Sequence, residues 1–252
     1  MAQLLLRGTV LGDVDAVLFD KDGTLSVSEP QLTTLAAARV LLCLDAVEPA
    51  LRPRLRDLLE RAYGISAAAG AIHPAGITAV ASRDHNLVAT ATALVQVGLG
   101  WPEALAISEA AFAQADQADA RGASATTEGL LPWLQQLHAA GITCAVISND
   151  DNAGIQHFLA SHGLERFFAG FWSAEQRPRK PDPAAVHGLC GQLGVAVGRC
   201  ALIGDANSDL RMAVAAGIPH QLSLGYTAAW TTPPPLAEPH PLVHGWSELS
   251  LA

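Results

Sequence analysis

The feature that most constrains the fold is a set of short apolar runs that end in polar, reactive residues. The first run, AVLFD at residues 16–20, is followed directly by Lys21, Asp22 and Gly23. A run that is apolar throughout predicts a strand buried on both faces, as in parallel sheets covered by helices. The run ends with two carboxylates one residue apart, which indicates a functional site at that edge of the sheet.

Further runs of the same kind recur along the chain, separated by amphipathic helical patterns. They lie at residues 142–149, 167–172, 199–205 and 220–226. One intervening helix is expected to begin near Pro132 and end before Gly141, and another to be capped by Asn152 and end at Gly163. Strands alternating with helices predict an α/β fold with a parallel sheet and crossover helices.

A long segment separates the first run from the second and has the pattern of one helix after another. Apolar residues keep a helical spacing over residues 32–43, 51–62, 87–99 and 102–120. Residues 64–86 are punctuated by glycine and are expected to be loop at both ends; they include His73, Arg83, Asp84 and His85. We therefore expect an inserted helical domain at residues 28–121 and a core domain formed by residues 1–27 and 122–252.

Composition excludes several classes of protein. The 252 residues are 50% hydrophobic and 15% charged, which suits a folded protein with a large core. We expect a cytoplasmic protein without membrane partners, because no apolar run approaches the roughly 20 residues of a membrane span and the start lacks signal-peptide order. The net charge of −9 argues against nucleic acid as a partner.

The cysteines suggest neither a disulfide framework nor a zinc site. Cys43, Cys144, Cys190 and Cys200 are widely scattered, and no two of them are separated by only two residues. We expect four buried free thiols.

The polar residues that follow the strand runs are expected to meet in one crevice, because ligands of open α/β sheets bind beyond the carboxyl ends of the strands. The set consists of Asp20, Asp22, Ser148, Asn149, Lys180 and Asp205. Carboxylates with a backbone carbonyl make an oxygen site suited to Mg²⁺. A lysine and a hydroxyl add a charge-compensated cradle for phosphate.

Four motifs carry a resemblance to a known family. FDKDGTL, VISN, RKPDP and GDANSDL occur in this order, each at or after a strand run. They resemble the four motifs of the haloacid dehalogenase superfamily, of which the first and last form a highly specific pair. The resemblance implies a Rossmann-like core, a mainly α-helical cap inserted after the first motif, Mg²⁺ dependence and a covalent aspartyl-phosphate intermediate.

The resemblance also implies roles for the acidic residues. Asp20 matches the nucleophile, whose second oxygen binds the metal. Asp22 matches the general acid and base, and its main-chain carbonyl matches a metal ligand. Asp205 corresponds to a direct metal ligand, with Asp209 as an outer group of the same metal site. If a helix begins at Asp205, the spacing of four residues places Asp205 and Asp209 on one face.

The remaining matched residues would bind the phosphoryl group. Ser148 corresponds to the hydroxyl that holds a phosphoryl oxygen, and Lys180 to the lysine that offsets charge between nucleophile and phosphate. Gly23 would permit a tight turn that aims amide N–H groups at phosphate, and Asn149 follows Ser148 in the second motif.

Each assignment has a simpler alternative. Ser148 and Asn149 could cap the next helix, and Arg177 or Arg179 could supply the charge assigned to Lys180. Asp209 could favour a helix dipole without any metal.

Lys21 departs from the family pattern, which more commonly has an apolar residue between the two aspartates. Lys21 could contact the substrate or the cap, and a structural ion pair with a carboxylate of the cap is at least as strong an expectation.

The leading hypothesis is a Mg²⁺-dependent phosphatase that hydrolyses a small phosphorylated metabolite, similar to phosphoglycolate phosphatases. Asp22 argues against a dehalogenase, which lacks this second aspartate. The alternative is a phosphoglucomutase-like enzyme that returns the phosphoryl group to a sugar. A catalytically silent scaffold would be expected to lack at least one of Asp20, Asp22, Lys180 and Asp205, and all are present.

Overall fold

The computed structural model describes residues 2–66, 70–118, 122–237 and 239–252. Its contacts divide the chain into two compact units: Met1–Ser28 with Ala123–Ala252, called the core unit, and Glu29–Gly122, called the helical unit. The second predicted domain boundary, between residues 121 and 122, adjoins residues outside the described ranges. Among the described helices, none combines the length and the apolar character needed to cross a membrane.

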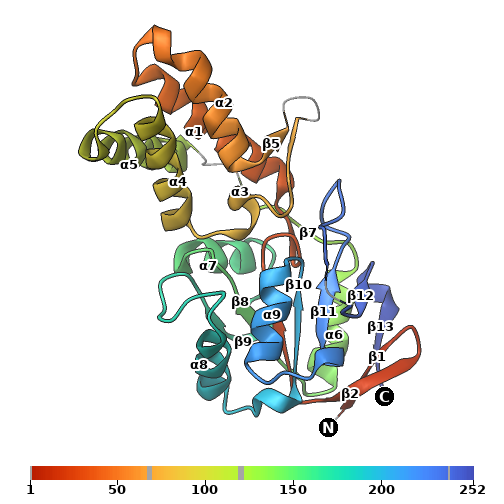
Figure 1. Ribbon diagram of the computed structural model, residues 1–252. Helices are drawn as coiled ribbons and strands as arrows, with labels where there is room; N and C mark the ends of the chain where they lie inside the picture. Colours follow the sequence, from red (N-terminus) through yellow and green to blue (C-terminus); the bar gives the residue numbers. More distant parts are fainter. Residues whose placement is uncertain (1, 67–69, 119–121, 238) are drawn as a thin grey trace. The chain divides into compact units, whose positions relative to one another are not determined.

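A parallel sheet organises the core unit (Figure 1). Within the described residues it has six strands in the order β12-β11-β10-β3-β8-β9, each parallel to its neighbour. The strands are β3 (Ala16–Phe19), β8 (Thr143–Ile147), β9 (Phe168–Trp172), β10 (Cys200–Gly204), β11 (Ser223–Tyr226) and β12 (Leu242–Val243). The predicted apolar runs overlap five of these strands, and every residue of β3 and β10 is buried.

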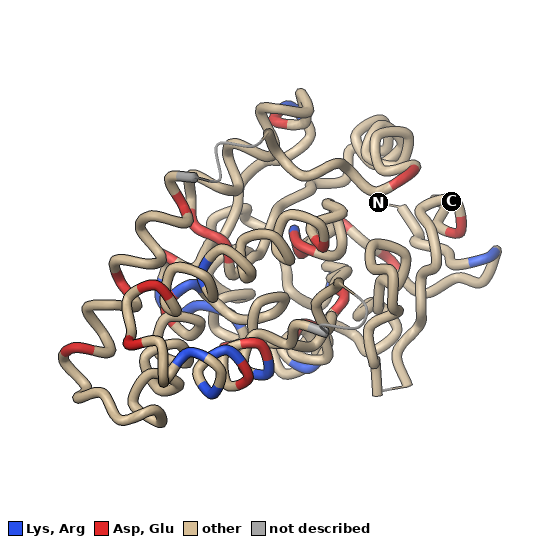
Figure 2. Tube along the Cα trace, turned by 90° about the horizontal axis from the view of Figure 1, so that it is seen from above, with Lys and Arg blue, Asp and Glu red and all other residues tan. Residues whose placement is uncertain are grey.

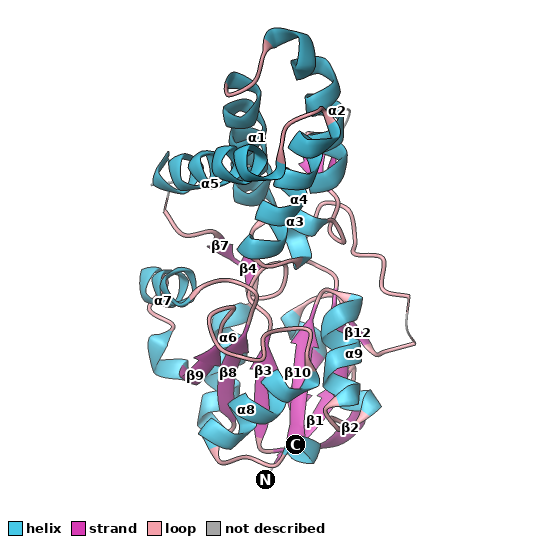
Figure 3. Ribbon diagram, turned by 60° about the vertical axis from the view of Figure 1, so that its left-hand side comes forward, coloured by secondary structure: helices cyan, strands magenta, loops and turns pink. Residues whose placement is uncertain are grey.

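Helices cover both faces of this sheet, which is why its strands are apolar throughout (Figure 3). The helices α6 and α7 lie in the connections that lead to β8 and then β9, toward one edge of the sheet, whereas α8 and α9 lie in the connections that lead to β10 and then β11, toward the other edge. Because such connections are right-handed, the two pairs of helices lie on opposite faces of the sheet. Their bounds are α6 (Leu130–Ala139), α7 (Asn152–Ser161), α8 (Pro183–Leu193) and α9 (Asn207–Ala215). The structure confirms the predicted α/β class.

The helix ends follow local capping chemistry. Pro132 lies in the first turn of α6, and Gly141 adopts φ +72° just beyond its end, as predicted. The prediction that Asn152 caps α7 is wrong, because the Asp151 carboxylate accepts the Gly154 amide at 2.7 Å and Asn152 is the first helical residue. An aspartate immediately before the helix is the stronger acceptor for these free N–H groups.

Two smaller β elements of the core unit were not predicted. The strands β1 (Ala2–Leu6), β2 (Thr9–Val14) and β13 (Leu249–Leu251) form an antiparallel sheet that joins the two ends of the chain. The strand β4 (Ser26–Val27) pairs with β7 (Ala125–Thr126), so the chain segments that leave and re-enter the core unit run side by side. Pairing between residues so distant in sequence leaves no local pattern to detect.

The helical unit contains the expected helices (Figure 1). They are α1 (Glu29–Asp45), α2 (Arg52–Tyr63), α4 (Arg83–Gln96) and α5 (Trp101–Ala118). Their buried faces include Val40, Leu55, Leu59, Tyr63 and Leu94. The predicted range of the last helix, residues 102–120, includes residues 119 and 120, which lie outside the described ranges.

The glycine-punctuated stretch 64–86 is more ordered than predicted. It holds the hairpin strands β5 (Ile65–Ser66) and β6 (Ala71–Ile72), the short helix α3 (Ile77–Val80) and the first turn of α4. Residues 67–69 of this stretch lie outside the described ranges.

Basic and acidic residues lie next to each other in several places along the chain, as neighbouring blue and red segments of Figure 2 show. On α2, Arg56 pairs with Glu60 at 3.4 Å and Arg61 with Asp57 at 2.9 Å, both at the spacing of one helical turn. Exposed pairs of this kind stabilise a helix only slightly, so the apolar face of α2 supplies most of its docking energy.

Close packing of α8 against β9 depends on Gly188. A Cβ at this position would lie 2.3 Å from the ring of Trp172, whose indole N–H donates to the Pro178 carbonyl at 2.8 Å. Gly191 is on the same helix, and a Cβ there would meet no atom within 4 Å.

We therefore predict opposite effects for two alanine substitutions in α8. Gly188→Ala should lower the free energy of unfolding by about 1–3 kcal/mol, because the indole must shift. Gly191→Ala should raise it by about 0.5–1 kcal/mol, because alanine favours the helix. Urea denaturation measures both, and equal stabilisation by the two substitutions would contradict the packing argument.

Candidate active site

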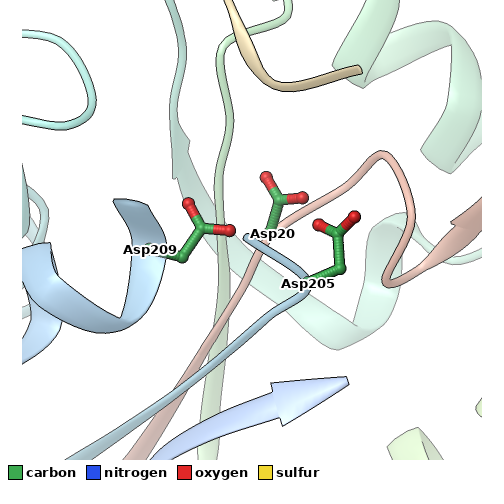
Figure 4. A group of neighbouring side chains, drawn as sticks. All are labelled: Asp20, Asp205 and Asp209. Carbon is green, nitrogen blue, oxygen red and sulfur yellow. The ribbon is translucent and has the colours of Figure 1, made fainter. Parts of the chain in front are cut away.

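Three buried carboxylates gather at the carboxyl end of the sheet (Figure 4). Asp20 follows β3, Asp205 follows β10, and Asp209 lies in the first turn of α9. Carboxylate oxygens of the three lie within 4.8 Å of one another, and the residues are 6%, 3% and 2% exposed. The helix α9 begins at Asn207, not at Asp205 as the predicted spacing assumed, so the strand end and the helix each supply one carboxylate.

Lys180 offsets part of this negative charge. Its ammonium lies 2.7 Å from Asp20 Oδ1 and 2.7 Å from Asp209 Oδ1, and it donates to the Ile147 carbonyl at 3.2 Å. Burial alone would lower the pKa of Lys180, but the two carboxylates outweigh it and raise that pKa. Lys180 therefore stays charged and ties the ends of three segments together.

Asp20 and Asp205 are protonated more readily than usual. Burial, with the charge of Asp209, raises the pKa of Asp20 to about 6 against the opposing effect of Lys180. Burial and the neighbouring Asp20 raise the pKa of Asp205 well above its ordinary value. A bound divalent cation would offset the charge of these buried carboxylates and so stabilise their ionised form.

The third motif accounts for where Lys180 lies. Asp182 caps α8 by accepting the Ala184 amide at 2.9 Å, and Pro183 opens the helix, so Lys180 is held just before a rigid helix start. Arg177, one alternative source of charge, instead donates to the carbonyls of Ala174 and Gln176. Lys180, the lysine of the motif, reaches the carboxylates of Asp20 and Asp209.

Ser148 follows β8 and lies on the same edge of the sheet. It is 2% exposed, its amide donates to the Trp172 carbonyl at 2.9 Å, and its hydroxyl accepts the Asp150 amide at 3.1 Å. Asn149 follows in the same loop. The side chain that caps α7 is Asp151, so the capping alternative does not apply to Ser148 or Asn149.

Gly23 is required by the close approach of its neighbours. Its φ is +80°, and a Cβ there would lie 2.2 Å from Asp205 Oδ2 and 2.3 Å from Trp230 Nε1. The Trp230 indole donates to Asp205 Oδ2 at 2.6 Å. Sequence reasoning missed Trp230, because an aromatic residue in a loop after β11 belongs to no motif.

The Asp22 side chain lies outside the carboxylate group. Its Oδ1 accepts from Lys21 Nζ at 2.7 Å, from the Ser28 hydroxyl at 2.5 Å and from the Ser26 hydroxyl at 3.4 Å. Burial would raise the pKa of Asp22, but Lys21 and the two hydroxyls outweigh it and lower that pKa. Its assignment as a metal ligand concerned the main-chain carbonyl and stays a prediction.

The expectation that Lys21 pairs with a carboxylate of the cap is wrong. Its ammonium pairs with Asp22 and, at 3.1 Å, with Asp150 Oδ2, and both carboxylates belong to the core unit. Lys21 is 7% exposed, and its ammonium lies 5.7 Å from the centre of the Phe158 ring. Lys21 lies between Asp20 and Asp22 in the sequence, and both of these ion-pair partners belong to the same unit as Lys21.

The family model of the haloacid dehalogenase-like hydrolases matches residues 14–217, which include all four motifs and the eight site residues on them. The chain belongs to the haloacid dehalogenase-like hydrolase family. This confirms the family that the motifs predicted.

Curated relatives of this hydrolase are phosphoglycolate phosphatases. The one from Colwellia psychrerythraea is 30% identical over 216 residues, which cover 82% of this chain and 83% of that protein. The one from Photobacterium profundum is 29% identical over 122 residues, or 48% of this chain and 53% of that protein. The chain thus spans about half the length of several curated relatives that it matches.

A solved structure shares the fold of the hydrolase. A predicted phosphoglycolate phosphatase from Haemophilus somnus superposes with a TM-score of 0.67 at 20% identity, over 93% of this chain and 96% of that chain. At this identity the likeness supports the fold, and the chemistry is argued from the site.

The contacts of Gly23 predict that Gly23→Ala disrupts the carboxylate group. If the carboxylate group holds Mg²⁺, displacing Asp205 and Trp230 should weaken that binding by about tenfold or more, as when a contact that supports a metal ligand is lost. Isothermal titration with Mg²⁺ measures this.

Gly8→Ala is the matched control, because Gly8 has φ +79° but a Cβ at this position would meet no atom within 4 Å. Both variants bear the cost of a left-handed alanine, about 1–2 kcal/mol, and only Gly23→Ala meets the site. Equal Mg²⁺ affinity in the two variants would show that Gly23 matters for backbone conformation alone.

Proposed function

We propose that the chain is a Mg²⁺-dependent phosphatase that hydrolyses a small phosphate monoester through an aspartyl-phosphate intermediate. The observation that carries this proposal is the buried group of Asp20, Asp205 and Asp209 with Lys180 bridging two of its members. Such a group binds a hard cation and a phosphoryl group together, and a purely structural role would not require so many buried carboxylates.

The donor set suits Mg²⁺. Asp20 and Asp205 would hold it directly, with Asp209 and the Asp22 carbonyl completing the protein contribution, and the remaining positions suit water and a phosphate oxygen. Bound there, Mg²⁺ would neutralise charge on the phosphoryl group and so favour attack by an anionic carboxylate.

In the first step Asp20 acts as nucleophile. One of its oxygens forms a bond to phosphorus while the ester P–O bond breaks, and the departing alkoxide takes a proton from Asp22. Lys180 offsets the negative charge of carboxylate and phosphoryl group as they meet, and the Ser148 hydroxyl donates to a phosphoryl oxygen.

In the second step Asp22 acts as base. It removes a proton from a water molecule, whose oxygen forms a bond to phosphorus while the bond to Asp20 breaks. Inorganic phosphate leaves and both carboxylates regain their starting states. One residue therefore gives a proton in the first step and takes one in the second.

Phosphoglycolate is the first substrate to test, because the curated relatives are named for it. A small monoester also agrees with a core site that consists of a few convergent polar groups. Release of inorganic phosphate distinguishes hydrolysis from the phosphoglucomutase-like alternative, in which the phosphoryl group returns to a sugar.

We predict that Asp20→Asn abolishes turnover and leaves the fold intact. An amide is nearly equal in size to a carboxylate but is a poor nucleophile and a weaker Mg²⁺ ligand, so phosphate release should fall at least about 100-fold. Circular dichroism checks the fold. Activity above about one per cent of the wild type would count against covalent catalysis at Asp20.

Asp22→Asn should slow both the formation and the hydrolysis of the aspartyl phosphate. The loss in the formation step should be smaller for p-nitrophenyl phosphate than for phosphoglycolate, because nitrophenolate leaves without a proton. Single-turnover phosphorylation of Asp20 measures this step alone. The same factor of loss for both esters would refute the general-acid role.

A further inference from the structure

The chain contains two lysines, Lys21 and Lys180, and arginine supplies every other cationic side chain apart from histidine. Both lysines are buried at the site, 7% and 5% exposed, and each bridges two carboxylates. Lys180 bridges Asp20 and Asp209, and Lys21 bridges Asp22 and Asp150. The proposed function uses the first bridge and leaves the second without a role.

The second bridge holds the Asp22 side chain outside the group of carboxylates at which the proposed reaction takes place. The Asp22 oxygen that Lys21 contacts also accepts from Ser28 and Ser26, and the Asp22 carboxylate does not belong to the group of Asp20, Asp205 and Asp209. In the proposed mechanism, the Asp22 side chain moves toward a leaving oxygen at Asp20 and loosens its contact with Lys21.

If Asp22 were the sole counter-charge of Lys21, loosening their contact would leave a buried ammonium unpaired, which is strongly unfavourable in a protein interior. Asp150 removes this obstacle because its Oδ2 already lies 3.1 Å from Lys21 Nζ. The Asp22 and Asp150 side chains are 22% and 30% exposed, against 8% for Lys21, so the cation is the buried member and the carboxylates flank it.

The fold holds Asp150 in place for this contact. A Cβ at Gly154, in the first turn of α7, would lie 2.3 Å from Asp150 Oδ2, so glycine leaves the space that the carboxylate occupies. The Asp150 amide donates to the Ser148 hydroxyl at 3.1 Å, and the Asp150 carbonyl accepts the Ala174 amide at 2.8 Å. The second bridge therefore links the loop of the proposed acid to the loop of the phosphoryl-binding hydroxyl.

We propose that Lys21 is a positioning residue for Asp22, and that Asp150 is the second counter-charge that lets Asp22 leave Lys21 during the reaction. The inference rests on the proposed function, because it assigns the acid and base role to Asp22. In this arrangement Lys21 does not touch substrate and acts only through Asp22, and Asp150 acts only through Lys21.

The test uses single-turnover phosphorylation of Asp20 in the full-length protein with Mg²⁺. Lys21→Met should slow phosphorylation by phosphoglycolate by about tenfold or more and by p-nitrophenyl phosphate by less than about threefold, with KM within about twofold. Arg166→Met, which removes an exposed cation of the core unit, should leave both rates unchanged.

Two double-variant comparisons separate this role from a structural one. Lys21→Met should have no further effect on the rate of phosphorylation by phosphoglycolate in an Asp22→Asn background. Asp150→Asn should slow the same reaction in the otherwise wild-type protein and should have no further effect in a Lys21→Met background. If Lys21→Met does not fold, Asp150→Asn in wild-type and Asp22→Asn backgrounds supplies the same comparison at a more exposed position.

Equal loss for the two esters, or effects that multiply in the double variants, would overturn the inference and leave the proposed function standing. If Asp20 of the wild-type protein is not phosphorylated, both the proposed function and this inference would be overturned. The ester-dependent loss together with the missing second effect would support both.

Discussion

The site depends on balancing charge in a place where water is scarce. Asp20, Asp205 and Asp209 are each less than a tenth exposed, and their carboxylates lie within 4.8 Å of one another. Burial, together with repulsion between the neighbouring carboxylates, favours protonation of such a group, as the raised pKa values of Asp20 and Asp205 indicate. Lys180 therefore stabilises the folded site by pairing with two of the three carboxylates.

The parallel sheet makes this concentration of charge tolerable. The strands β3, β8 and β10 lie next to one another, so the loops that follow them meet although they are far apart in sequence. Each of these strands is anchored by nearly continuous apolar burial, which supplies the favourable free energy against which the buried charges are set. Asp20, Ser148 and Asp205 follow these strands directly and are held in place by them.

Much of this could be predicted from the sequence, because strand period and motif order are local signals. The apolar runs located five strands of the sheet, and the four motifs located the residues that converge on Lys180. The antiparallel sheet of β1, β2 and β13 could not be predicted, because its pairing joins opposite ends of the chain. The capping role of Asp151 over Asn152 was decided by which of two adjacent polar side chains reaches the Gly154 amide, and the pattern of residue types does not contain that detail.

The features of the site that pattern reasoning missed are contacts of motif residues with residues outside the motifs. Trp230 reaches Asp205 from a loop without a signature, and Gly23 matters because both approach its Cα. Likewise the partner of Lys21 was expected in the cap, and its second carboxylate is instead Asp150 of the core unit. A motif specifies which groups react, whereas such contacts decide how each group is held and which of its movements are energetically accessible. The proposed task of Asp22 requires its side chain to change partners. The neighbouring residues Lys21 and Asp150 are therefore constrained mainly by the need to allow that movement.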